Sequence, residues 1–191
     1  MINISAPFDA IPSPEGRADK ENRVYSFMEK HNIPLYGIDH DSADTMEICR
    51  EIEGILGADI CKNLFLCNAQ ATTFYLLLMP GKKAFKTKFL SKQINSSRLS
   101  FGSAENMEKY LDITPGSVSV MGLMNDKDNA VNLLIDKELL SLDYIGIHPC
   151  VNTSTLRLSL DDLINKLIPA LGRTYTVVDL PDPNDIIENN G

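Results

Sequence analysis

Short apolar runs separated by a few turn-forming residues most constrain the fold of this chain. They cover residues 62–67, 73–79, 131–135 and 144–147. Such runs outnumber the amphipathic segments, and many are joined by turns too short to contain a crossover helix. A doubly wound parallel sheet requires such helices, so the pattern argues against one. We predict an α+β fold with a mixed, largely antiparallel sheet flanked by helices.

The remaining segments complete the expected order of elements. We predict helices over residues 19–31, 45–56, 85–93, 103–111 and 163–168, and further strands over residues 33–39, 98–101, 118–124 and 176–180. Asp44 is the expected N-cap of the second helix, Ser103 caps the fourth, and Ser159 begins a near capping box before the last. The polar residues 68–72 predict a hairpin turn.

The length of 191 residues fits one domain with a sizeable core. We divide the chain into an extended, proline-containing arm (1–18), a single domain (19–180) and an acidic tail (181–191). Apolar residues make up 43% of the chain, and no apolar run approaches the roughly 20 residues of a membrane helix. With no signal-peptide pattern and no CxxC pair among its four cysteines, we expect a cytoplasmic protein with reduced thiols.

The distribution of charge is uneven. The net charge of −8 argues at first against a nucleic-acid partner. Residues 81–104, however, contain no acidic residue and six basic ones: Lys82, Lys83, Lys86, Lys88, Lys92 and Arg98. This segment is either a solvated surface or a local docking patch for a polyanion.

Metal and phosphate-loop patterns are weak. His31, His40 and His148 are far apart, and the sequence contains neither GxxxxGK[ST] nor GxGxxG. His40-Asp41 could be half of a metal site, but we interpret it as a surface pair at a strand end. No metal or cofactor is therefore expected.

Residues 145–155, Ile-Gly-Ile-His-Pro-Cys-Val-Asn-Thr-Ser-Thr, bring several polar groups to the end of an apolar run. Pro149 biases His148 toward extended backbone. We interpret the segment as one wall of a site. A cysteine hydrolase using Cys150 with His148 and Asn152 is an alternative, but neighbours along one strand rarely meet as nucleophile and base, so Cys150 fits better as a small buried residue.

Lys62 directly precedes the apolar residues of its run. A charged side chain at the start of a strand is either exposed to solvent or part of a functional site, and the residues alone leave both interpretations open.

Several blocks resemble the YbaK/ProX-type aminoacyl-tRNA deacylases. They are residues 61–66 (CKNLFL), 98–102 (RLSFG), 111–118 (LDITPGSV), 122–126 (GLMND), 148–153 (HPCVNT) and 177–180 (VVDL). Each block is short, but all occur in the family's order between about residues 24 and 180. The sequence is most similar to freestanding members that hydrolyse alanine from mischarged tRNA(Pro).

The resemblance implies a mixed, partly barrel-like sheet flanked by helices, and an esterase that uses an oriented water without metal or cofactor. By position, Lys62 would hold the terminal phosphate or the acyl carbonyl, and His148 would be the second catalytic residue. The implied substrate-binding residues are Asn63, Gly116, Gly122, Asn152 and Thr153, and the implied tRNA-docking residues are Lys82, Lys83, Lys86, Lys88 and Lys92. Val120 stands where the family loop has proline, so the resemblance does not carry over that loop's rigidity or its amino-acid selectivity.

The implied partners are mischarged tRNA(Pro) and prolyl-tRNA synthetase, with no membrane association and a monomer or weak dimer. A non-catalytic module that binds aminoacyl-tRNA or a synthetase through the same cleft is the alternative. We further expect His148 and Asn152 to face Lys62 across the cleft.

Overall fold

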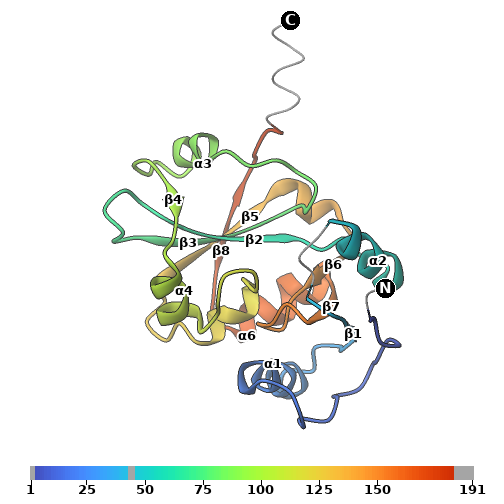
Figure 1. Cartoon of the computed structure of the whole chain (residues 1–191). Coiled ribbons are helices and arrows are strands. Elements are labelled where there is room, and N and C mark those ends of the chain that lie inside the picture. Colours follow the sequence, from blue (N-terminus) through green and yellow to red (C-terminus); the bar gives the residue numbers. More distant parts are fainter. Residues whose placement is uncertain (1–2, 43–45, 183–191) are drawn as a thin grey trace, which may run out of the picture.

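The strands of the computed structural model, which describes residues 3–42 and 46–182, form two sheets (Figure 1). The larger has the order β4-β2-β3-β5-β8 and the smaller the order β1-β7-β6. Their bounds are β1 Gly37–Asp39, β2 Lys62–Cys67, β3 Phe74–Met79, β4 Ser100–Phe101, β5 Val131–Asp136, β6 Tyr144–Ile147, β7 Ser154–Ser159 and β8 Tyr175–Val178.

The mixed, largely antiparallel character is confirmed. The pairs β2–β3, β2–β4, β1–β7 and β6–β7 are antiparallel, and β3–β5 and β5–β8 are parallel. The partly barrel-like expectation is wrong for the described residues. The larger sheet ends at β4 and β8 and the smaller at β1 and β6, so neither closes on itself.

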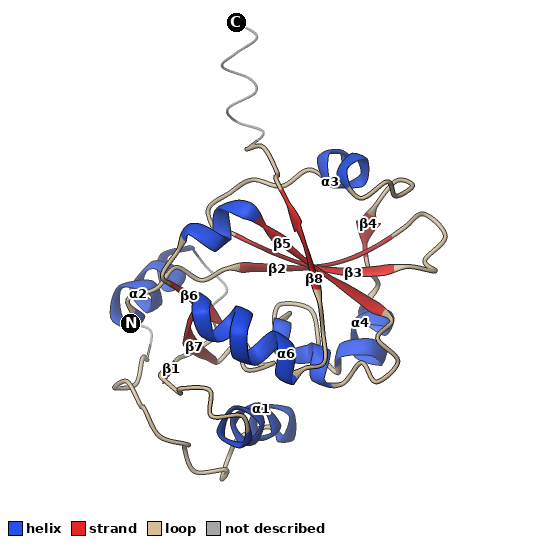
Figure 2. Ribbon diagram, turned by 180° about the vertical axis from the view of Figure 1, so that it is seen from behind, coloured by secondary structure: helices blue, strands red, loops and turns tan. Residues whose placement is uncertain are grey.

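Helices cover both faces of the larger sheet, as Figure 2 shows, with α3 on one side and α4 and α6 on the other. The helical segments are α1 Asp19–Lys30, α2 Met46–Leu56, α3 Thr87–Gln93, α4 Ala104–Leu111, η1 Val120–Met124, η2 Lys137–Ser141, α5 Leu160–Asp162, η3 Leu163–Leu167 and α6 Ile168–Ala170. The last helix begins as predicted, because the Ser159 hydroxyl accepts the Asp162 amide at 3.0 Å.

Successive side chains of β3 point to opposite faces of the larger sheet and pack in two separate core clusters. Leu76 and Leu78 pack with the α4 side of the sheet, whereas Leu77 and Met79 pack with Leu90 of α3. Both faces of β3 are therefore buried, which explains why its sequence reads as a continuous apolar run.

Two strand predictions differ from the structure. Residues 118–124 form an extended entry and a 3-10 turn rather than a strand, because the Ser119 hydroxyl accepts the Met121 amide and starts the turn. Strand β7 was missed, although Leu156 and Leu158 alternate with Ser, Thr and Arg in the manner of a half-buried strand. The predicted strands 33–39 and 98–101 shorten to β1 and β4.

The N-terminal arm packs along β1. The Phe8 amide donates to the Gly37 carbonyl at 2.8 Å, and the Arg17 guanidinium donates hydrogen bonds to both carboxylate oxygens of Asp39. The predicted cap Asp44 and tail residues 183–191 lie outside the described residues.

Gly81 supplies a fold prediction because the chain passes close to it. A Cβ at this position would lie 2.1 Å from the Ile60 carbonyl oxygen. We expect Gly81→Ala to lower the free energy of unfolding by about 1–3 kcal/mol, measured by urea denaturation.

Gly54, inside α2, is the matched control, since nothing lies within 4 Å of its virtual Cβ. We expect Gly54→Ala to be neutral or to stabilise by up to about 1 kcal/mol through helix propensity. Equal effects of the two substitutions would show that the contact with Ile60 does not constrain the fold.

Candidate functional site

Lys62 is placed by the register of the β2–β3 hairpin. It pairs with Met79, the last residue of β3, and therefore lies beside the turn that follows. Its ammonium donates to the Lys83 carbonyl at 2.6 Å. No ion pair among the described residues involves Lys62. The half-buried Lys62 side chain therefore has no carboxylate partner within the described part of the chain, which suits its ammonium to bind an anion or a developing oxyanion.

A cavity of about 270 Å³ opens beside Lys62. Helix α2, the start of β2 and the turn after β3 provide its lining: Cys49, Arg50, Glu53, Ile60, Cys61, Lys62, Gly81 and Lys82. Four of these eight residues are charged, three of them basic, so the cavity favours a ligand that carries negative charge.

Lys83 lies next to this cavity but serves the fold. Its ammonium is buried and forms ion pairs of 2.9 Å with Asp136 and with Glu138. Burial alone would lower the pKa of Lys83, but the hydrogen bonds to these carboxylates outweigh it and the pKa is raised. The predicted docking role does not fit a buried, paired ammonium, whereas the backbone carbonyl of Lys83 does hold Lys62.

Asn63 joins β2 to the loop of residues 114–120. Its side-chain oxygen accepts the Val120 amide at 3.0 Å, and its amide nitrogen donates to the Cys61 carbonyl at 3.3 Å. A proline at position 120 would have no N–H to give. Val120 therefore allows a hydrogen bond that a proline at this position could not make.

The same loop reaches Asn152. Pro115 and Gly116 form the centre of a turn in which Gly116 has φ +90° and the Ser117 amide donates to the Thr114 carbonyl. A Cβ on Gly116 would lie 3.9 Å from the Asn152 side-chain nitrogen. Gly122, in contrast, is buried, and a Cβ there would lie 2.5 Å from an Ile113 methyl carbon, so its role is close packing.

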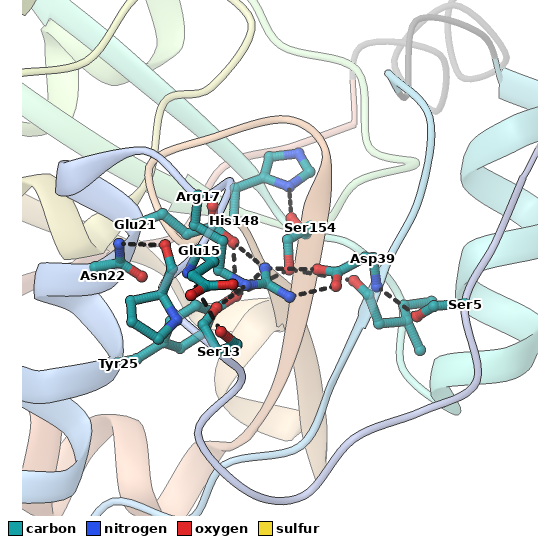
Figure 3. Close-up of polar contacts among 12 residues, drawn as sticks. Ser5, Ser13, Glu15, Arg17, Glu21, Asn22, Tyr25, Asp39, His148 and Ser154 are labelled. Atoms are coloured by element: carbon teal, nitrogen blue, oxygen red, sulfur yellow. Dashed lines mark hydrogen bonds and ion pairs between the residues drawn. The ribbon is translucent and has the colours of Figure 1, made fainter.

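His148 is held by the start of β7. Its Nδ1 lies 3.0 Å from the Ser154 carbonyl oxygen, which can only accept a hydrogen bond. The neutral ring therefore carries its proton on Nδ1 and a lone pair on Nε2. Burial lowers the pKa of His148, so the ring is neutral at pH 7. Figure 3 shows Ser154 between the His148 ring and the cluster around Asp39 and Arg17.

The 114–120 loop links two of the predicted site residues, Asn63 and Asn152. The 114–120 loop touches Asn63 through Val120 and lies against Asn152 through Gly116. Asn152 in turn donates to the Ser42 hydroxyl at 2.7 Å, at the start of the chain leading to α2, and the neighbouring Thr153 carbonyl accepts the His40 amide. The cavity beside Lys62 is lined by neither His148 nor Asn152, so their opposition across a cleft stays a prediction.

His40 was misjudged from the sequence. It is buried, with only 6% of its surface exposed, and its Nε2 lies 2.8 Å from the Thr155 hydroxyl. The surface-pair interpretation is therefore wrong. A histidine just past a strand that pairs with β7 could have been placed only by knowing that pairing.

Cys150 does not fit a catalytic thiol. It is buried in a left-handed conformation with φ +65°, and burial raises the pKa of its thiol to about 12. A nucleophilic cysteine needs the opposite shift. The interpretation of Cys150 as a small buried residue is confirmed. Within residues 3–42 and 46–182, no group of three His, Cys, Asp or Glu side chains is arranged to hold a metal ion.

Comparison with known proteins places this geometry in a class. Residues 40–166 match the model of the aminoacyl-tRNA editing domain. The chain belongs to this family, whose members hydrolyse the ester of aminoacyl-tRNA. It is 34% identical over 163 residues to the prolyl-tRNA editing protein ProX of Acetoanaerobium sticklandii, a match that covers 85% of this chain and 98% of that protein.

Solved structures show the same fold. A proposed trans-editing enzyme for prolyl tRNA synthetase superposes with a TM-score of 0.63 at 17% identity, covering 86% of this chain and 98% of that one. A scaffold used for computational grafting of linear epitopes has a TM-score of 0.65 at 16% identity, covering 86% and 97%. No helix of the described residues is long and apolar enough to cross a membrane.

The buried thiols give a prediction that is independent of catalysis. Burial raises the pKa of both Cys61 and Cys150 to about 12, so neither forms appreciable thiolate at pH 8. We expect both to react with an aromatic disulfide reagent at least about 100-fold more slowly in the native protein than in urea. Single variants Cys61→Ser and Cys150→Ser assign the signals. Rapid modification of Cys150 in the native protein would reopen the thiol-hydrolase alternative.

Proposed function

We propose that this protein removes a wrongly attached amino acid from tRNA(Pro) in trans, with Ala-tRNA(Pro) as the preferred substrate. The 34% identical relative is named a prolyl-tRNA editing protein, which supports the choice of tRNA. The observation that carries the catalytic part is Lys62, half-buried at a cavity and without a carboxylate partner among residues 3–42 and 46–182.

Lys62 is the proposed electrostatic catalyst. In hydrolysis, water adds to the acyl carbonyl carbon and negative charge develops on the carbonyl oxygen. An ammonium held by a backbone carbonyl is already oriented and needs no reorganisation to stabilise this charge. Alternatively it holds the terminal phosphate, which would fix the ester in the same place. Asn63, tied to the 114–120 loop, would shape the wall beside it.

His148 is the proposed base. With its proton on Nδ1, the Nε2 lone pair can take a proton from the attacking water. The tetrahedral intermediate then collapses, the bond between the acyl carbon and the ribose oxygen breaks, and that oxygen receives the proton from His148. The products are the free amino acid and uncharged tRNA, and the step balances without a metal ion or cofactor.

Selectivity for alanine over proline would come from steric exclusion. A small pocket rejects a larger side chain more strongly than a large pocket rejects a smaller one, which is the principle of a double sieve. We assign the pocket wall to the 114–120 loop, with Gly116 at its turn and Asn152 and Thr153 beside it. Gly122 supports the loop by packing against α4. The Val120–Asn63 hydrogen bond would fix the loop's position.

We propose a tRNA-docking surface with fewer basic residues than expected from the sequence. Lys82 is exposed but bonds Asp59 at 2.9 Å, and Lys83 is buried. The remaining exposed basic residues of this segment lie just before, on and after α3: Lys86, Lys88, Lys92 and Arg98. Phe101, 64% exposed on the edge strand β4, lies beside Phe85 at 6.4 Å between ring centroids. Basic side chains next to an exposed aromatic ring are typical of surfaces that bind single-stranded RNA.

Prolyl-tRNA synthetase is the proposed partner, because it supplies the mischarged substrate. We propose that the protein acts in the cytoplasm as a monomer or weak dimer.

The catalytic proposal predicts the behaviour of Lys62→Ala. We expect kcat/KM for Ala-tRNA(Pro) to fall about 100-fold or more, as for loss of an oxyanion-stabilising group. Release of labelled amino acid from alanyl, cysteinyl, seryl and prolyl esters of tRNA(Pro) is the measurement. Lys127→Ala, an exposed lysine near Met124, is the control.

Alanine release at the wild-type rate by Lys62→Ala would refute the assignment of Lys62. Salt-sensitive tRNA binding by the wild type with no turnover of any ester would instead indicate the non-catalytic module.

The docking proposal predicts a change in salt dependence. We expect the triple variant Lys86→Glu, Lys88→Glu, Lys92→Glu to weaken tRNA binding at least about tenfold and to reduce the log–log salt slope by about two to three. The control reverses three exposed lysines elsewhere, at Lys30, Lys109 and Lys127, giving the same net charge. Equal losses in both variants would mean that overall charge, rather than the α3 surface, governs binding.

A further inference from the structure

A chain of hydrogen bonds leads from His148 into the buried interior. The Thr155 hydroxyl lies 3.4 Å from His148 Nδ1 and 2.8 Å from His40 Nε2. His40 Nδ1 lies 2.8 Å from the Asp41 carbonyl oxygen. Thr155 is fully buried, and the two imidazole rings are 6.4 Å apart.

The directions of these hydrogen bonds are fixed by the groups at the two ends. The Asp41 carbonyl can only accept, so His40 carries its proton on Nδ1 and its Nε2 must accept. The Thr155 hydroxyl therefore donates its single proton to His40. The lone pairs of the Thr155 oxygen are then free to accept a hydrogen bond from the His148 Nδ1–H. The Ser154 carbonyl accepts from the same N–H at 3.0 Å.

We propose that His40 is a positioning residue for His148, acting through Thr155. This inference rests on the proposed role of His148 as the base. By keeping the Thr155 hydroxyl turned toward itself, His40 gives the His148 Nδ1–H a second acceptor. That acceptor favours the tautomer with Nε2 free, and it stabilises the imidazolium that forms when His148 takes a proton from water. A third group that orients the base is a recurrent device in hydrolases.

The arrangement is sensitive to acid. Burial lowers the pKa of His40, although the Asp41 carbonyl and the carboxylates of Asp39 and Asp41 act in the opposite direction. Arg17 pairs with Asp39 from the other side, and His148 is the titratable group facing His40 from the β6–β7 turn. Protonated His40 would donate from Nε2 and turn the Thr155 proton away. Because the pKa values of both histidines are lowered in the folded protein, the hydrogen-bond chain is intact at pH 7 and is lost only at a pH below the ordinary pKa of histidine.

The test compares Thr155→Val with Thr155→Ser. Valine keeps the shape of threonine without the hydroxyl, whereas serine retains the hydroxyl. With only three histidines in the chain, ¹⁵N-histidine NMR can follow the tautomer and pKa of His148 directly. We expect Thr155→Val, which loses one hydrogen bond, to lower the pKa of His148 and to reduce kcat/KM at pH 7 about fivefold. Thr155→Ser, which retains the hydroxyl, should leave both quantities at the wild-type level.

His40→Gln and Tyr25→Phe complete the comparison. Glutamine can accept from Thr155 without titrating, so His40→Gln should keep the His148 tautomer at pH 7 and shift the acidic limb of the pH profile. Tyr25 contacts the Ser154 hydroxyl at 3.2 Å and is equally buried, so Tyr25→Phe controls for loss of a buried hydroxyl and should leave the His148 tautomer unchanged.

An unchanged His148 tautomer and pKa in Thr155→Val, or an equal shift in Tyr25→Phe, would overturn the inference. Because the NMR comparison does not depend on turnover, it decides the role of His40 even if the protein hydrolyses none of the esters.

Discussion

The antiparallel pairing of β2 with β3 is the contact on which the rest of the site depends. Six residue pairs align in one register, from Lys62 opposite Met79 to Cys67 opposite Phe74. A slip of one residue would turn every side chain of β2 to the other face. The observed register puts Lys62 beside the turn after β3, where the Lys83 carbonyl holds its ammonium. It also buries the Lys83 side chain against Asp136 at the end of β5, so the turn is anchored from both sides.

The smaller sheet plays the corresponding role for His148. Pairing of β7 with β1 aligns Thr155 with Ile38 and sets His40 against Thr153, so two histidines more than one hundred residues apart in sequence share one hydroxyl. The 114–120 loop links this region to the first residues of β2. The proposed site thus spans two sheets, which are joined by a shared core and by backbone hydrogen bonds of Gly146 in β6 with residues 59 and 61. We expect its selectivity to depend on the Val120–Asn63 contact, because that hydrogen bond links the 114–120 loop to β2.

Charge is distributed between folding and binding. Of the six basic residues in the segment 81–104, Lys82 and Lys83 are paired with carboxylates from other parts of the chain. Burying the Lys83–Asp136 ion pair costs desolvation free energy, and separating the pair would leave an uncompensated buried charge. The pair therefore favours one conformation of the turn after β3. The four exposed basic residues around α3 leave a local positive surface on a chain of net charge −8. An acidic protein can therefore still present a locally basic surface.

The sequence alone determined the α+β class, the hairpin, the caps at Ser103 and Ser159, the burial of Cys150 and the family, because these depend on local periodicity, capping chemistry and short ordered motifs. It misplaced residues 118–124, missed β7, suggested a partly barrel-like sheet, assigned Lys83 to docking and interpreted His40 as a surface residue. Each of these depends on partners distant in the sequence: a strand needs a neighbour, and a lysine or histidine is buried only when a carboxylate or hydroxyl elsewhere satisfies it. Local pattern showed which residues carry chemistry, and only tertiary pairing decided which of them meet.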